Sequence, residues 1–102
     1  MDNFTRISVQ KAYEMISTGN ALTIVDIRDA HSFAQGHVPN AKMLNNENMK
    51  DFLQVTDKET PLICYCYHGF SSQQAALFLA DQGFKKVYSI DGGWEELRKI
   101  HG

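Results

Sequence analysis

Apolar residues in this chain follow two alternating spacings, which predict strands separated by helices. Short, nearly continuous apolar runs with β-branched residues occur at 21–26, 61–66 and 87–90. Runs of this kind are typical of strands buried on both faces, as the strands of parallel sheets are. Shorter pieces at Ile7 and at 41–44 are candidates for edge strands.

Between these runs, apolar residues recur three and four positions apart, which is the spacing of one helix face. Four helices are predicted on this basis: 9–16 after the N-cap candidate Ser8, 49–53, 75–80, and a last one from about Trp94. Strands that alternate with helices imply right-handed crossovers and a parallel sheet covered by helices on both faces. We therefore predict an α/β fold. Its site should lie beyond the carboxyl ends of the strands, near 26–28, 66–72 and 91–93.

Composition narrows the class of protein. The chain has 102 residues, of which 43% are hydrophobic and 22% charged, so we expect one globular domain over 1–102. Ten Lys and Arg against twelve Asp and Glu give a net charge of −2, which argues against a nucleic-acid partner. The first residues carry no apolar run typical of a secretory signal, and the longest uncharged stretch, 60–80, is too polar to cross a membrane. We expect a cytoplasmic protein with no membrane partner.

The segment that follows the predicted strand 61–66 has the residues of a reactive thiol site. Cys66 stands where the strand ends, Gly69 permits backbone angles that a side chain would penalise, and Ser71 or Ser72 is suited to cap the next helix. Inward-facing N–H groups in such a turn and the positive end of the helix dipole favour a bound anion. We therefore expect a lowered pKa for Cys66, which would act as a nucleophile. The anion-binding loop is predicted to comprise Tyr67, His68, Gly69, Phe70, Ser71 and Ser72.

The two cysteines also allow other interpretations. A cysteine that ends an apolar strand can be a core residue, and the residues alone leave Cys66 open between that role and catalysis. Cys64 points to the same sheet face, and we expect it to be packed as a free thiol, with a resolving or redox role as the alternative. A metal is not expected on Cys64, Cys66 and His68, because zinc sites usually space their first cysteines more widely and add a second ligand cluster.

Three blocks resemble the rhodanese (thiosulfate sulfurtransferase) family in order and spacing. Residues 25–41, VDIRDAHSFAQGHVPNA, resemble the family signature D-x-R-x(4)-F-x-x-G-H-[IV]. Residues 66–71, CYHGFS, resemble its six-residue active loop, and residues 83–94, GFKKVYSIDGGW, resemble its closing signature. Together the blocks run from Asp26 to Trp94, a span that takes in most of the chain.

The resemblance implies a single rhodanese-like domain with about five parallel strands and helices on both faces. It also implies transfer of sulfane sulfur from thiosulfate, through a persulfide on Cys66, to cyanide, a small thiol or a thioredoxin-like dithiol protein. No metal or organic cofactor is expected, because sulfur serves as electrophile and as nucleophile in the two half-reactions. Asp26 and Arg28 are expected to stabilise the fold as an ion pair, and His37 as a hydrogen-bonding residue.

The loop departs from many rhodaneses because it contains neither Arg nor Lys. Thiosulfate, a dianion, would be held by amides, hydroxyls and a protonated His68, and we expect modest affinity for it. Tyr67 and Phe70 are suited to form an apolar rim for a larger thiol partner.

Two other functions remain as alternatives. A cysteine-dependent phosphatase or arsenate reductase would need a loop one residue longer that closes with Arg, whereas Ser71 and Ser72 stand at the fifth and sixth positions after Cys66. A non-catalytic rhodanese-like binding module commonly lacks the cysteine that this chain carries.

Overall fold

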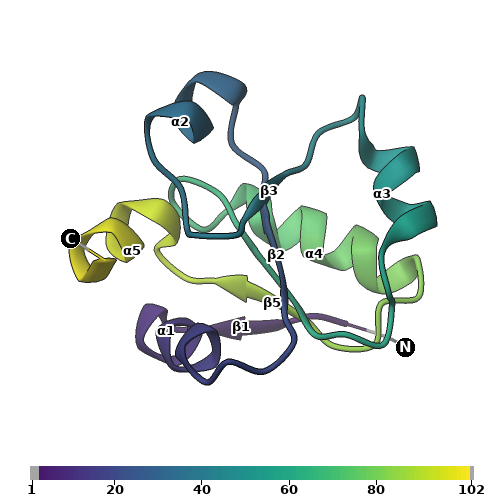
Figure 1. Cartoon of the computed structure of the whole chain (residues 1–102), viewed down its shortest axis with the longest axis horizontal. Helices are drawn as coiled ribbons and strands as arrows, with labels where there is room; N and C mark the ends of the chain where they lie inside the picture. Colours follow the sequence, from purple (N-terminus) through teal and green to yellow (C-terminus); the bar gives the residue numbers. More distant parts are fainter. Residues whose placement is uncertain (1–2, 102) are drawn as a thin grey trace.

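The computed structural model describes residues 3–101 and shows a parallel sheet between two layers of helices (Figure 1). Its elements in chain order are β1 (Thr5–Ile7), α1 (Val9–Ser17), β2 (Thr23–Asp26), α2 (Ala30–Gln35), β3 (Lys42–Met43), α3 (Met49–Val55), β4 (Leu62–Tyr65), α4 (Ser71–Asp81), β5 (Val87–Ile90) and α5 (Gly93–His101). The five strands have the order β1-β5-β4-β2-β3, and all neighbours are parallel. The predicted α/β class is confirmed, and both short segments predicted as edge strands lie at the edges of the sheet.

The sheet separates two hydrophobic cores. Because side chains alternate along a strand, β4 directs Leu62 and Cys64 to the face covered by α3 and α4. It directs Ile63 and Tyr65 to the opposite face, where α1 and α5 pack. All four side chains are fully buried, which explains why the sequence of this central strand is apolar without interruption.

Side-chain hydrogen bonds fix the first residues of two helices, α1 and α2, and α2 was not predicted. Ser8 caps α1 as expected, because its side chain accepts a hydrogen bond from the N–H of Lys11. The unpredicted helix is α2, which is only six residues long, has no fully buried residue and therefore lacks a clear apolar period. Its start is fixed by Asp29, whose carboxylate accepts the N–H of Ser32 at 2.7 Å. No helix within residues 3–101 has the length and apolar character to cross a bilayer.

The carboxyl ends of the three central strands meet at one edge of the sheet, as predicted. The N–H of Ile27, just after β2, donates to the carbonyl of Tyr65 at the end of β4. The N–H of Trp94, at the start of α5, donates to the carbonyl of Cys66 at 2.8 Å. The segments 26–28, 66–72 and 91–93 therefore form one connected region.

Candidate active site

The side chain of Cys66 lies inside the curl that the chain makes between β4 and α4. The backbone N–H of Gly69 donates to its Sγ at 3.1 Å, and the N–H of Ser72 donates to it at 3.2 Å. The Oγ of Ser72 lies 3.4 Å from the same sulfur. The predicted inward-facing amides are thus present, and they converge on one atom.

This arrangement favours the thiolate form of Cys66. Burial raises the pKa of the thiol, but the hydrogen bonds that Ser72 makes through its side chain and backbone, and those from the backbone of Gly69 and His68, lower it by more. The net pKa is below the ordinary value for cysteine, so the predicted direction is confirmed. The thiolate is the nucleophilic form of cysteine.

The prediction that Ser71 or Ser72 caps α4 is wrong. The helix begins at Ser71, and its N-cap residue is Phe70, which makes no side-chain capping bond. The N–H of Ser72 in the first turn donates to the sulfur of Cys66, so the thiolate takes the position that a cap oxygen normally has. The sulfur therefore lies at the positive end of the α4 dipole. The side chain of Ser72 is fully buried and contacts the Oγ of Ser89 at 2.8 Å.

The loop backbone packs directly on the turn between β5 and α5. Gly69 has φ +95°, and a Cβ at this position would lie 2.7 Å from the backbone nitrogen of Gly92. Gly93 has φ +57°, and a Cβ there would collide with the carbonyl oxygen of Cys66. Gly92 and Gly93, from the third sequence block, therefore allow the turn between β5 and α5 to contact the loop that follows β4. The shape of the loop around the Cys66 sulfur depends on that contact.

A cavity of about 330 Å³ opens onto Cys66, which is itself only 6% exposed. Its lining comprises Ile27, Arg28, Asp29, Ser32, Cys66, Tyr67 and Ser71. A smaller recess of about 120 Å³ reaches the same cysteine between Tyr67, His68, Phe70 and Ser71. Tyr67 and Phe70 are exposed, as expected for the rim of the site. The sulfur is thus shielded from bulk water but can be reached by a small anion.

Cys64 lies on β4 and is fully buried among the apolar side chains that face α3 and α4. Its Sγ donates to the carbonyl oxygen of Ser72 at 3.2 Å. Burial, and to a smaller degree the neighbouring Cys66, raise the pKa of the Cys64 thiol. Both cysteines are free thiols, and the predicted packing role of Cys64 is confirmed.

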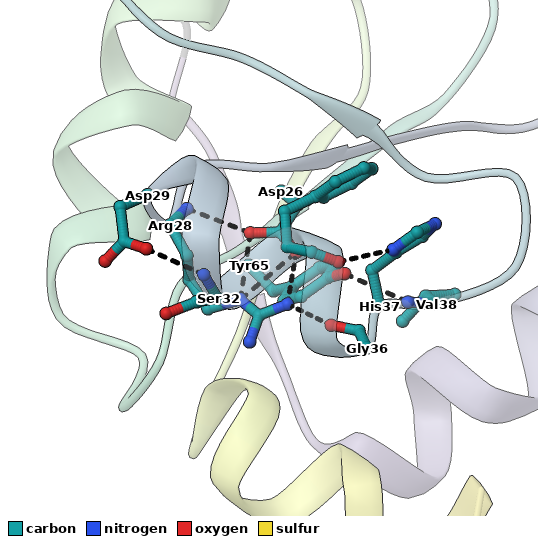
Figure 2. Close-up of polar contacts among 9 residues, drawn as sticks. Asp26, Arg28, Asp29, Ser32, Gly36, His37, Val38 and Tyr65 are labelled. Carbon is teal, nitrogen blue, oxygen red and sulfur yellow. Dashed lines mark hydrogen bonds and ion pairs between the residues drawn. The ribbon is translucent and has the colours of Figure 1, made fainter.

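Asp26 and Arg28 form the predicted ion pair at the end of β2 (Figure 2). Their closest atoms, Asp26 Oδ2 and Arg28 Nη2, are 2.7 Å apart, and both side chains are almost fully buried. The same Nη2 donates to the carbonyl of Gly36 at 2.6 Å, and the guanidinium lies 4.7 Å from the ring centroid of Trp94. Arg28 is the only Lys or Arg in the lining of the Cys66 cavity among residues 3–101, and its charge is already paired with Asp26.

His37 lies outside the Cys66 cavity and has the predicted hydrogen-bonding role. Its Nδ1 is 2.8 Å from the carbonyl oxygen of Phe33, and the two rings are stacked with centroids 3.8 Å apart. His68 lies in the loop, where its ring contacts the edge of Tyr67. Within residues 3–101, no three His, Cys, Asp or Glu side chains are grouped so that they could hold a metal ion.

A family model described as a rhodanese-like domain matches residues 8–99 of the chain. The chain belongs to the rhodanese-like family. A relative from Stutzerimonas stutzeri, named thiosulfate sulfurtransferase GlpE, is 50% identical over 99% of this chain and 91% of its own length. One with the same name from Ectopseudomonas mendocina is 52% identical over 93% and 85%. The crystal structure of a rhodanese-like domain protein from Staphylococcus aureus matches with a TM-score of 0.80 at 23% identity, covering 92% of this chain and 91% of that one.

Two residues of this rhodanese-like site were not found from the sequence. Ser89 forms a hydrogen bond with the side chain of Ser72. It lies on β5 and reaches the site only because β5 pairs with β4, where Ser89 is opposite Cys64. Trp94, near which the last helix was predicted to start, is half-buried, packs against the core on the α1 and α5 side and contacts Arg28. Neither contact has a local signal in the sequence, since each joins residues on different elements.

Proposed function

We propose that this protein is a thiosulfate sulfurtransferase, built as one rhodanese-like domain over 1–102, in which Cys66 carries the transferred sulfur. The observation that carries the proposal is the convergence of two backbone N–H groups and one hydroxyl on the Sγ of Cys66. The named GlpE relatives support the same activity, because they match nearly the whole chain. We also propose that the protein acts in the cytoplasm.

The first half-reaction begins with the Cys66 thiolate. It attacks the outer sulfur of thiosulfate, a new S–S bond forms, and the bond between the two thiosulfate sulfurs breaks. Sulfite leaves with the electron pair of that bond, and Cys66 is left as a persulfide. The terminal sulfur of the persulfide carries the negative charge, and the amides of the loop stabilise it as they stabilise the thiolate. We propose no separate general base, because the hydrogen bonds of the loop favour the thiolate form of the nucleophile.

The second half-reaction returns Cys66 to its starting state. Cyanide or a thiolate attacks the terminal sulfur, the S–S bond to Cys66 breaks, and the cysteine leaves as a thiolate. The product is thiocyanate with cyanide, or a hydropersulfide with a thiol. A thioredoxin-like dithiol protein would continue by forming its own disulfide and releasing sulfide. The chemistry needs no metal or organic cofactor, and ping-pong kinetics follow from the two separate steps.

The substrate anion is proposed to bind in the loop formed by Tyr67, His68, Gly69, Phe70, Ser71 and Ser72. Arg28 lines the cavity, but Asp26 neutralises it. Binding of thiosulfate therefore relies on backbone amides, hydroxyls and the ring of His68, and we propose a modest affinity for thiosulfate. Asp26, Arg28 and His37 are proposed to support the site without touching substrate.

A phosphatase or arsenate reductase activity is disfavoured by the same geometry. Stabilising a phosphoryl transition state in a cysteine loop requires a clamping cation. The cavity lining described here offers only Arg28, which is paired. A purely binding role is disfavoured because a non-catalytic module has no need for a thiolate cradle.

The test compares two cysteine variants in a thiosulfate–cyanide assay. Cys66→Ser should abolish thiocyanate formation, because an alcohol at this position does not ionise and cannot carry sulfur. Cys64→Ser is the matched control and should retain most of the activity, with some loss of stability from packing. Activity that survives in Cys66→Ser would refute the proposal, and rapid release of phosphate from an aryl phosphate would favour the phosphatase alternative.

A further inference from the structure

A second hollow adjoins the Cys66 cavity. Its volume is about 490 Å³, and it lies between the first turns of α4 and the segment that leads from β3 into α3. Ile27 and Ser71 line both hollows, so the two hollows lie next to each other at the loop. We call the second hollow the α4 groove. The reaction proposed above gives it no role, because neither thiosulfate nor cyanide is large enough to need it.

The lining of the α4 groove differs in chemistry from the cavity around Cys66. Met49 and Phe78 contribute apolar surface, and its polar groups include the side-chain amides of Asn45, Asn46 and Gln74. Its lining includes no acidic, basic or histidine side chain among the described residues. A charged ligand would lose its hydration there without gaining a partner of opposite charge. An apolar chain would pack on Met49 and Phe78, and an amide group on that chain could form hydrogen bonds with the side-chain amides of the groove.

The exposure of Phe78 supports a ligand site in this groove. The side chain is 42% exposed on α4, one position after Leu77, which is 43% exposed. Only Phe78 of this pair belongs to the lining of the groove. A bound apolar chain would cover part of the Phe78 ring and remove apolar area from water.

We propose that the α4 groove binds the body of the sulfur acceptor, and that this acceptor is an uncharged organic thiol with an apolar chain and an amide group. The inference rests on the sulfurtransferase activity proposed above. With its body in the groove, the acceptor presents its thiolate to the persulfide beyond Ser71 and Ile27. The thiolate attacks the terminal sulfur, a hydropersulfide of the acceptor forms, and Cys66 leaves as a thiolate, so that no further reactant is needed.

The main test measures steady-state kinetics with thiosulfate as donor and N-butanoylcysteamine, an uncharged thiol with an amide and a short apolar chain, as acceptor. Phe78→Ala should raise the KM for this thiol about five-fold, the loss expected for one partly covered aromatic contact, with little change in kcat. Leu77→Ala should leave the KM unchanged. With cyanide as acceptor, both variants should behave as the wild type does, because cyanide does not extend into the groove.

A second arm tests the preference for an uncharged ligand. N-acetylcysteine and its amide have nearly the same shape and differ by one negative charge. Gln74→Lys should raise the ratio of kcat/KM for N-acetylcysteine to kcat/KM for its amide several-fold relative to the wild type, because the new ammonium group offers the carboxylate a partner. Taking the ratio of variant to wild type for each thiol cancels the difference between the pKa values of the two thiols.

The outcomes separate the two proposals. If the wild type transfers sulfur to cyanide but Phe78→Ala does not change the KM for N-butanoylcysteamine, the groove proposal is overturned and the sulfurtransferase proposal stands. The groove proposal is also overturned if Leu77→Ala has the same effect as Phe78→Ala. If the wild type transfers no sulfur to cyanide, the proposed function itself fails.

Discussion

The Oγ of Ser72 lies 2.8 Å from the Oγ of Ser89, and both side chains are fully buried beneath Cys66. When Cys66 is a thiolate, its sulfur can only accept hydrogen bonds. Ser72 then uses its proton for the sulfur, and its oxygen accepts the proton of Ser89. Ser89 thus acts on Cys66 through Ser72, as a positioning residue that touches no reacting atom.

We predict that Ser89→Ala raises the pKa of Cys66, because Ser72 loses the donor that directs its own proton toward the sulfur. The pH dependence of Cys66 alkylation by iodoacetamide measures this pKa. Ser72→Ala should raise it as well. The double variant should match Ser72→Ala alone, since Ser89 has no route to the sulfur without Ser72. Additive shifts would contradict the relay.

The ionisation of Cys66 should also make stability depend on pH. The pKa of Cys66 is lower in the folded chain than in the unfolded chain, so its stabilising contribution is present above the unfolded pKa. That contribution is lost as the pH falls through the folded pKa. We predict that the free energy of unfolding of the wild type rises, relative to Cys66→Ser, as the pH rises toward the ordinary cysteine pKa of about 8.5. Urea unfolding of both proteins at each pH measures the difference, and a constant difference would contradict the prediction.

Arg28→Met should destabilise the fold by about 3 kcal/mol, because it leaves the fully buried carboxylate of Asp26 without its partner. Urea unfolding measures the loss. The matched control is Arg6→Met, which breaks the exposed ion pair with Asp91, whose side chains are 60% and 42% accessible. That change should cost far less, because water replaces the lost partner. Equal losses in the two variants would mean that burial of the Asp26–Arg28 pair has no energetic consequence.

Gly93→Ala should destabilise the protein and slow sulfur transfer. Gly93 has φ +57°, and a methyl group there would press on the carbonyl oxygens of Cys66 and Tyr67, which shape the loop. Gly19→Ala is the control, because Gly19 has φ +80° but open space around it, so only the backbone cost of roughly 1 kcal/mol applies. Unfolding and thiosulfate–cyanide assays should show a larger stability loss for Gly93→Ala, and an activity loss for that variant alone. An active Gly93→Ala would show that the glycine contact does not shape the site.

Local patterns in the sequence were enough to predict much of the fold. The apolar run of β4, the cap at Ser8 and the position of Cys66 at a strand end each depend on neighbours in the chain. Helix α2 was missed because its only strong local signal is the Asp29 cap. Within the site, the local sequence predicted that the side chain of Ser71 or Ser72 would cap α4. In the structure the sulfur of Cys66 has that role, because it accepts the N–H of Ser72.

The remaining contacts depend on how distant segments pair. Ser89 reaches Ser72 because strands β4 and β5 are in register, and Arg28 meets Trp94 because α5 starts beside the end of β2. A sequence pattern reports the face on which a residue lies but not its partner on another element. These long-range contacts could therefore be found only in three dimensions.

The proposed reaction requires Cys66 to carry the sulfur, and intact-protein mass spectrometry after exposure to thiosulfate tests this directly. We predict that the protein gains one sulfur atom, that fragmentation places it on Cys66, and that cyanide removes it. Cys64→Ser should gain the same mass, and Cys66→Ser should gain none. A protein that gains no sulfur, or gains it on Cys64, would contradict the central claim.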